Sequence, residues 1–432
     1  MWAALRCARR PGRGRLRRAA RPRRRRHPPG PEGVAILSPR SRSTVEATLP
    51  VVGAHIGEIS ERFYLRLFAA VPELGTNLFN RTNQQNKSQQ EALASSVAAF
   101  ATLLVSHAPQ DITPIMARIA AKHASLGVQA AQYEVVRTHL FAAIVEVLGS
   151  AVTPEVAEAW NEVYTLMANT LVEQETLLYE NSGVSPGDVW RPVVVADREY
   201  DGAHATTLFL RSVDGSPLPG FLPGQYISVR IRFRDGTEQI RQYTVVRGRV
   251  PGEWSLSVKR VSGGLVSPVL VDQVATGHRL SVSLPFGGLV VDGSDAPLLL
   301  VSAGIGITNS IAALQHLAVH DPTRRITVLH VEHSPYEHVR RVQFSKLVAD
   351  MPHARLHVRY TDFDGIREDG RNPLSGVTLD PRSQTYVCGP VDFMRAIRNE
   401  LVESGLPARS IHYEAFAPGS WLGLEPEPQP TP

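Results

Sequence analysis

The chain has 432 residues, enough for about two to four domains, and its composition is typical of a globular protein. It contains no run of about 18 or more apolar residues, so we predict no transmembrane helix. Only two cysteines are present, Cys7 and Cys388, which argues against a disulfide framework. This cysteine usage suits a reducing compartment, so we expect a cytoplasmic protein.

Residues 1–42 form an arginine-rich extension. They contain 14 Arg and one Glu, so they contribute +13 to a formal net charge of +5, and the rest of the chain carries −8. Because Arg, Pro and Gly dominate it, we expect the extension to be disordered. It could be an organellar transit peptide, an arm for nucleic acid or a membrane surface, or an extension without function from a start codon assigned too early. No basic patch with interleaved aromatic residues occurs elsewhere, so nucleic acid is not an expected partner.

Residues 43–182 are predicted to form an all-α domain. Apolar residues recur there at spacings of three and four, as in Ile59, Phe63 and Leu67, and no convincing strand interrupts them. A stretch rich in Gly, Pro and Ser at 180–188 marks a linker after the last long helical pattern.

Residues 183–292 are predicted to form an antiparallel β-barrel or sandwich. Short β-rich runs separated by turns indicate this architecture. The runs are 191–197, 205–213, 224–233, 239–246, 254–261 and 278–285.

Residues 293–418 are predicted to form an α/β domain with a parallel sheet. Buried strands alternate there with helical patterns, and ligands of such folds bind at the carboxyl ends of the strands. The expected strands are 297–302, 325–333, 354–363 and 384–390, with a helix at 309–318. Residues 419–432 are expected to be a disordered tail.

Four polar residues fall on apolar stripes of the predicted helices: Tyr64, Gln89, His123 and Glu175. Buried polar groups need partners, and a single core histidine is usually structural. Four such groups in one small helical domain favour a haem, because one imidazole nitrogen can bind iron while the other donates to a neighbour.

The sequence from 44 to 418 resembles the flavohaemoglobin family, in which a globin precedes a ferredoxin-reductase-like module for FAD and NAD. The resemblance in the helical region rests on RFYLRLF (62–68), VPELGTNLFN (71–80), NQQNKSQQEAL (83–93), IAAKHASLG (119–127) and EAWNEVYTLMANTLVEQE (158–175).

On the oxygen-binding side, the resemblance implies that Tyr64 and Gln89 form the distal pair over bound dioxygen and that Leu93 is an apolar wall. A hydroxyl and an amide can donate to negative charge that develops on the gas. Phe79 is implied to pack on the face of the haem.

On the opposite side, the resemblance implies that His123 is the proximal ligand of the haem iron and that Tyr133 and Glu175 couple to it. A carboxylate that accepts from the imidazole N–H strengthens the other nitrogen as a donor to iron, which favours activation of O2 over simple carriage. Lys122 could be exposed, or it could help to position Glu175 or the haem.

For FAD, the segment 241–244 resembles the Arg-x-Tyr-(Ser/Thr) flavin signature, in which the arginine pairs with phosphate and the tyrosine packs on the ring. The segment 258–267 strengthens this reading, because its glycines and serine offer donors to a pyrophosphate. The implied FAD residues are Gln225, Tyr226, Arg241, Gln242, Tyr243, Thr244, Gly263, Gly264, Ser267, Glu414 and Phe416.

For NAD(P), the glycine-rich segment 301–310 follows a predicted strand and opens a helix, an arrangement that favours a phosphate at the helix N-terminus. The segment 386–394 resembles the second nicotinamide signature. The implied residues are Gly304, Gly306, Thr308, Cys388, Gly389 and Pro390.

This chain departs from the family pattern twice. Asn309 stands where proline is expected, and Ala417 stands where glycine is common. Asn can begin or cap a helix, so we expect nucleotide binding to survive. Their effect on the reductase is left open.

The resemblance implies a nitric oxide dioxygenase: electrons pass from NADH or NADPH to FAD and then to haem b, and O2 and NO are converted to nitrate. Two alternatives remain, a haem-based O2 or NO sensor with a weak reductase module and a diaphorase-like flavin reductase. Ser334, Arg340 and Arg341 could meet the 2′-phosphate of NADPH or be solvated. No stable protein partner is implied, and oligomeric state and lipid contact are left open.

Overall fold

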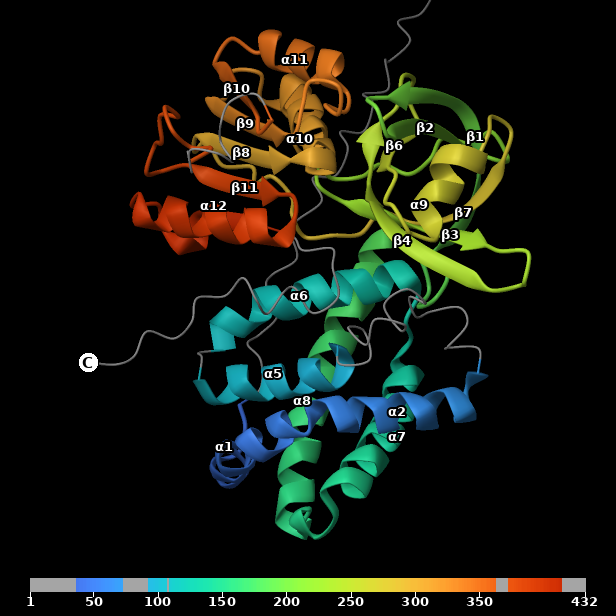
Figure 1. Cartoon of the computed structure of the whole chain (residues 1–432), viewed down its shortest axis with the longest axis vertical. Coiled ribbons are helices and arrows are strands. Elements are labelled where there is room, and N and C mark those ends of the chain that lie inside the picture. The colour runs from blue at the N-terminus through green and yellow to red at the C-terminus, as the bar shows by residue number, and fades with distance from the viewer. Residues whose placement is uncertain (1–35, 73–91, 107–108, 363–371, 414–432) are drawn as a thin grey trace, which may run out of the picture. The chain divides into compact units, whose positions relative to one another are not determined.

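Helices make up the described residues before residue 183. The computed structural model describes residues 36–72, 92–106, 109–362 and 372–413, all within one unit, Gly33–Pro432. The helices before residue 183 are α1 (Pro39–Ala54), α2 (Ile56–Ala70), α5 (Ala92–Ser106), α6 (Pro109–Leu126), α7 (Ala130–Leu148), η1 (Gly149–Ala151) and α8 (Pro154–Ser182) (Figure 1). None of the helices described is long and apolar enough to span a membrane.

The predicted apolar stripes form the core of this helical part. Ile59, Phe63 and Leu67 of α2 are each at most 1% exposed and pack in one cluster with residues of the other helices. Spacings of three and four place these side chains on one face of the helix, so burying that face holds α2 against its neighbours. The all-α prediction is confirmed.

The first helix begins earlier than expected. We predicted disorder for residues 1–42, but α1 starts at Pro39, and Leu37 is buried. Ser38 is the N-cap, because its hydroxyl accepts from the backbone N–H of Ser41, and Pro39 occupies the first helical position, where its missing N–H costs nothing. The predicted boundary at residue 43 is therefore wrong in its position.

One antiparallel sheet follows the helices. Its strands are β1 (Trp190–Asp201), β2 (Ala205–Ser212), β3 (Tyr226–Arg232), β4 (Glu238–Thr244), β5 (Val246–Arg247), β6 (Trp254–Lys259) and β7 (Arg279–Ser283), in the order β4-β3-β7-β1-β2-β6-β5. The short helices α9 (Val266–Pro268) and η2 (Val269–Gln273) lie between β6 and β7. Six of the seven strands coincide with the predicted β-rich runs, and the two-residue strand β5 had no run of its own. The antiparallel β domain is confirmed.

A parallel sheet makes up the last part of the structure. Its strands are β8 (Leu298–Ala303), β9 (Ile326–Glu332), β10 (Ala354–Tyr360), β11 (Gln384–Cys388) and β12 (Ile411–Tyr413), in the order β10-β9-β8-β11-β12. The helices are η3 (Gly304–Gly306), α10 (Ile307–His320), α11 (Arg341–Ala349), α12 (Val391–Glu403) and η4 (Ala408–Ser410). The parallel α/β prediction is confirmed, and β12 is a strand that it missed.

Alternate residues of these strands point to opposite faces of the sheet. Leu298 and Leu300 of β8 pack in one cluster with α10 and α11, whereas Leu299 and Val301 pack in another with α12. Burial on both faces explains the continuous apolar run of this strand. Strand order reverses between β8 and β11, so their carboxyl ends form the point at which ligands bind in open α/β sheets.

Candidate functional site

His123 makes the best-defined polar contact of the helical part. It lies near the C-terminal end of α6, and its Nδ1 is 2.8 Å from the hydroxyl oxygen of Tyr133 in α7 and 2.9 Å from Oε1 of Glu175 in α8. The Tyr133 hydroxyl donates to the same carboxylate oxygen at 2.5 Å. Because Tyr133 uses its proton on Glu175, Nδ1 carries a proton and donates it, and in a neutral imidazole this leaves the lone pair on Nε2.

Glu175 is shielded from water in this contact, whereas the imidazole of His123 is partly exposed. The Glu175 side chain is 3% exposed and the His123 side chain is 30% exposed. Burial, together with the negative charge of Glu175, raises the pKa of Tyr133, so this hydroxyl stays protonated. The Tyr164 hydroxyl donates to the carbonyl of Tyr133 at 2.7 Å and holds α7 against α8.

This donor set fits a haem. An accessible imidazole with Nδ1–H engaged and Nε2 free is the form in which histidine binds iron. The structure therefore brings together three of the predicted haem-side residues, which the sequence separates by up to 52 positions.

Tyr64 lies in α2 and is 4% exposed. Its ring packs against those of Phe63 and Phe68, with ring centroids 4.8 and 5.4 Å away. Burial raises the pKa of Tyr64, so its hydroxyl remains a donor at every physiological pH. Leu93 lies in the first turn of α5, and the predicted residues Phe79 and Gln89 lie outside the described residues.

The flavin signature lies on two paired strands. In the β3–β4 register, Tyr226 is opposite Thr244 and Val229 is opposite Arg241. Burial lowers the pKa of Arg241 and raises that of Tyr243. A desolvated guanidinium of this kind gains from an anionic partner, as the phosphate of a flavin nucleotide would be.

Further predicted FAD residues lie just before β3 and in the segment from the end of β6 to α9. Gln225 accepts from the N–H of Leu222 at 2.8 Å, just before β3. Gly263 has φ +71°, which favours glycine, and Ser267 accepts from the N–H of Val261 at 3.0 Å and closes the turn. The hydroxyl proton of Ser267 is still available to an anion. Gln242, the remaining residue of the signature, is described below.

The two nicotinamide signatures meet at the carboxyl ends of β8 and β11. A Cβ added at Gly306 would lie 2.3 Å from the carbonyl oxygen of Cys388, and one at Gly389 would lie 3.1 Å from Cβ of Ala303. Only glycine permits this approach. Thr308, in the first turn of α10, donates to the carbonyl of Ile305 at 3.0 Å.

Two further predicted residues complete these turns. Gly304 has φ +53°, and Pro390 is the N-cap of α12. Both turns thus open helices at the switch point, where backbone N–H groups can hold the phosphates of a dinucleotide.

Asn309 and Arg340 lie in different environments. Asn309 is 3% exposed, and its Nδ2 has no hydrogen-bond partner among the described residues. Arg340 donates to Oγ of Ser255 at 3.1 Å, and burial lowers its pKa to about 10, so its guanidinium is engaged within the protein. Glu414, Phe416 and Ala417 lie outside the described residues.

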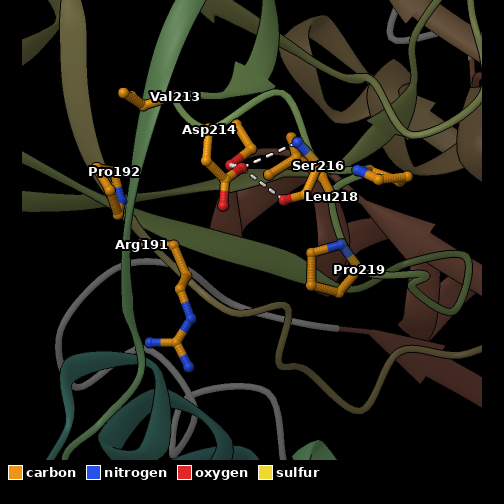
Figure 2. A pocket seen from close by; sticks show the side chains of 9 residues that line it. Arg191, Pro192, Val213, Asp214, Ser216, Leu218 and Pro219 are labelled. Atoms are coloured by element: carbon orange, nitrogen blue, oxygen red, sulfur yellow. Dashed lines mark hydrogen bonds between the residues drawn. The ribbon is translucent and has the colours of Figure 1, made fainter.

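A separate pocket of about 400 Å³ lies against β1 and the segment after β2. Figure 2 shows Asp214 in it, which accepts from the side chains of Ser212 and Ser216 at 2.5 and 2.6 Å. None of the predicted site residues lines this pocket. Its lining residues are Arg191, Pro192, Ser212, Val213, Asp214, Ser216, Pro217, Leu218 and Pro219.

Two family models match this chain. Residues 61–171 match the globin model, and residues 205–290 match that of the oxidoreductase FAD-binding domain. The first range lies within the helical part, and the second spans the antiparallel sheet from β2 to β7.

Relatives match over most of the chain. A flavohemoprotein of Bordetella parapertussis is 37% identical over 402 residues, which cover 89% of this chain and 99% of that protein. A flavohemoprotein of Rhizobium meliloti is 34% identical over 403 residues, with the same two coverages.

A solved structure agrees with both fold and sequence. The flavohemoglobin from Malassezia yamatoensis, crystallised with bound FAD and heme, has a TM-score of 0.81 and 30% identity and covers 89% of this chain and 100% of its own. These matches confirm the predicted resemblance and the order of a globin, an FAD domain and a parallel α/β domain.

Proposed function

Because this chain belongs to the flavohaemoprotein family and is an oxidoreductase with an FAD-binding domain, we propose that it acts as a nitric oxide dioxygenase. In this reaction NADH or NADPH supplies electrons through FAD to haem b, and NO and O2 become nitrate. The observation that carries the proposal is the contact of Nδ1 of His123 with Tyr133 and Glu175.

The haem supplies the iron at which O2 binds and reacts. This chain's own contribution is the electron donation of His123, which Glu175 increases by accepting a hydrogen bond from Nδ1–H, with Oε1 2.9 Å from Nδ1. Reversible O2 carriage does not need such a carboxylate, whereas activation of O2 gains from it. Tyr64 is a protonated donor that supports the oxygen-binding side.

The reductase residues support the supply of electrons. Arg241, Tyr243 and the turn at Gly263 are suited to the phosphate, ring and pyrophosphate of FAD, and the turns at Gly306 and Cys388 are suited to a nicotinamide nucleotide. The FAD and heme bound in the Malassezia yamatoensis flavohemoglobin support the same cofactors here. O2 and NO are the proposed small-molecule partners, and the cytoplasm is the proposed location.

The test is nitrate formation from NO in aerobic solution. NADH delivers two electrons, which suffice for two molecules of NO and two of O2 to become two nitrate ions, so we expect about two nitrate per NADH. The His123→Ala variant should lose nitrate formation yet still reduce cytochrome c through its flavin. Nitrate formation that is absent from the cofactor-replete protein, or unchanged in the variant, would contradict the proposal.

A further inference from the structure

A chain of buried hydrogen bonds joins the helix that carries His123 to the strand that carries the flavin signature. Ser125 in α6 and Ser228 in β3 are both fully buried, and their Oγ atoms are 2.9 Å apart. Nε2 of Gln242, in β4, donates to Oγ of Ser228 at 3.0 Å. No periodic pattern in the sequence pointed to either serine.

The direction of this chain follows from counting protons. Ser125 donates its hydroxyl proton to the carbonyl of Lys122 at 2.7 Å, so it can only accept from Ser228. Ser228 accepts from Gln242 and donates to Ser125. Three hydrogen bonds therefore run one way, from the amide of Gln242 to the carbonyl of Lys122, which precedes His123 in sequence.

The surroundings of the two serines exclude water and hold the end of α6 in place. Gly127 has φ +80°, and the N–H of Val128 donates to the carbonyl of His123 at 3.1 Å, which completes a helix-ending Schellman motif. Ala124 packs in one apolar cluster with Leu284 and Phe286, which follow β7. In such an environment a hydroxyl that loses its partner costs the full penalty of desolvation.

We propose that Ser125 and Ser228 are positioning residues for electron transfer between the flavin and the haem. Through them the flavin-signature strand β4 fixes the turn of α6 that holds His123. In each transfer one electron leaves the reduced flavin and ferric iron becomes ferrous, and NADH supplies the electron pair in advance. The inference rests on the proposed function for this electron path.

The test compares Ser228→Ala and Ser125→Ala with the wild type by anaerobic stopped-flow mixing of holoprotein with NADH. Flavin bleaching should keep its wild-type rate, because neither serine belongs to the proposed nucleotide residues. Haem reduction should slow about tenfold, because small misplacements of redox partners are costly. Ser125→Cys and Ser228→Cys preserve side-chain size while weakening both hydrogen bonds, so they provide the same comparison if the alanine variants lose haem or fold poorly.

A second readout does not depend on turnover. Amide hydrogen exchange of residues 122–126, measured by mass spectrometry, should be about fivefold faster or more in Ser228→Ala. This substitution lies in β3, across the Ser125–Ser228 hydrogen bond from the measured residues. Ser257→Ala is the matched control, because Ser257 is a buried serine whose hydroxyl contacts Thr207 within the antiparallel sheet. It should alter neither the exchange of α6 nor the rate of haem reduction.

The outcomes separate this inference from the proposed function. Haem reduction at the wild-type rate in every folded serine variant, or no flavin-to-haem transfer in the wild type, would overturn the inference. Fast haem reduction without nitrate formation would contradict the dioxygenase proposal alone, and slower haem reduction in the serine variants would still support the role of the two serines.

Discussion

At the scale of single residues, Glu175 is the group that we propose controls how strongly His123 donates to iron. Its carboxylate is 3% exposed and lies within hydrogen-bond distance of both His123 and Tyr133. Replacing it by an amide keeps the shape of the side chain and removes the negative charge. The variant Glu175→Gln therefore tests the effect of the negative charge alone.

We expect Glu175→Gln to lower the rate of NO consumption by about 10- to 100-fold. The iron–imidazole stretching band in resonance Raman spectra should move to lower frequency, because the imidazole is a weaker donor. Tyr179→Phe is the control: it removes the hydroxyl of another buried tyrosine of α8, which donates to the carbonyl of Val128, and should leave the band in place. An unshifted band in Glu175→Gln would refute this role.

Buried tyrosines make stability depend on alkaline pH. Burial raises the pKa of Tyr64 and Tyr164 above the ordinary value of 10.0. Above about pH 10 the unfolded chain loses these protons while the folded protein keeps them, so the free energy of unfolding falls as pH rises. Urea unfolding should show lower stability at pH 11 than at pH 8 and a smaller decrease in Tyr64→Phe. An identical decrease in both proteins would show that Tyr64 does not contribute.

At the scale of elements, the approach of two turns builds the nicotinamide side. The turn after β8 and the turn after β11 come so close that a Cβ at Gly306 would lie 2.3 Å from the carbonyl oxygen of Cys388. Gly306→Ala must push these turns apart. We expect at least a tenfold fall in the rate of flavin reduction by NADH, with FAD content unchanged.

Gly293→Ala is the matched control, since a Cβ there meets nothing within 4 Å. Stopped-flow reduction of the flavin by NADH measures both variants. Equal rates in Gly306→Ala and the wild type would mean that the contact between the turns does not shape the site.

The elements were predictable to the extent that local patterns determine them. The stripe of Ile59, Phe63 and Leu67 predicted α2, and the apolar run 297–302 predicted β8. The start of α1 at Pro39 was missed, because the proline and arginines around it resemble the preceding extension and the cap lies in the hydroxyl of Ser38. Strand β12 was missed because three residues carry too little periodicity, and it is defined by its pairing with β11.

At the scale of the whole molecule, residue types predicted which groups act, but not how they meet. Apolar stripes suggested His123 and Glu175 as haem-side groups, the family resemblance added Tyr133, and the folded helices bring the three within 2.9 Å of one another. The contact of Ser125 with Ser228 could not be foreseen, because a serine in an amphipathic helix resembles any small core residue. Such contacts depend on how separate parts of the chain pack.

The central claim is that His123 holds a haem in a protein that also holds a flavin. The absorption spectrum of purified, cofactor-replete protein tests it most directly, with His123→Ala as the comparison. We predict a Soret band and flavin absorption in the wild type, and flavin absorption with the Soret band lost or strongly shifted in the variant. A wild-type protein without a Soret band, or a variant whose band is unchanged, would contradict the claim.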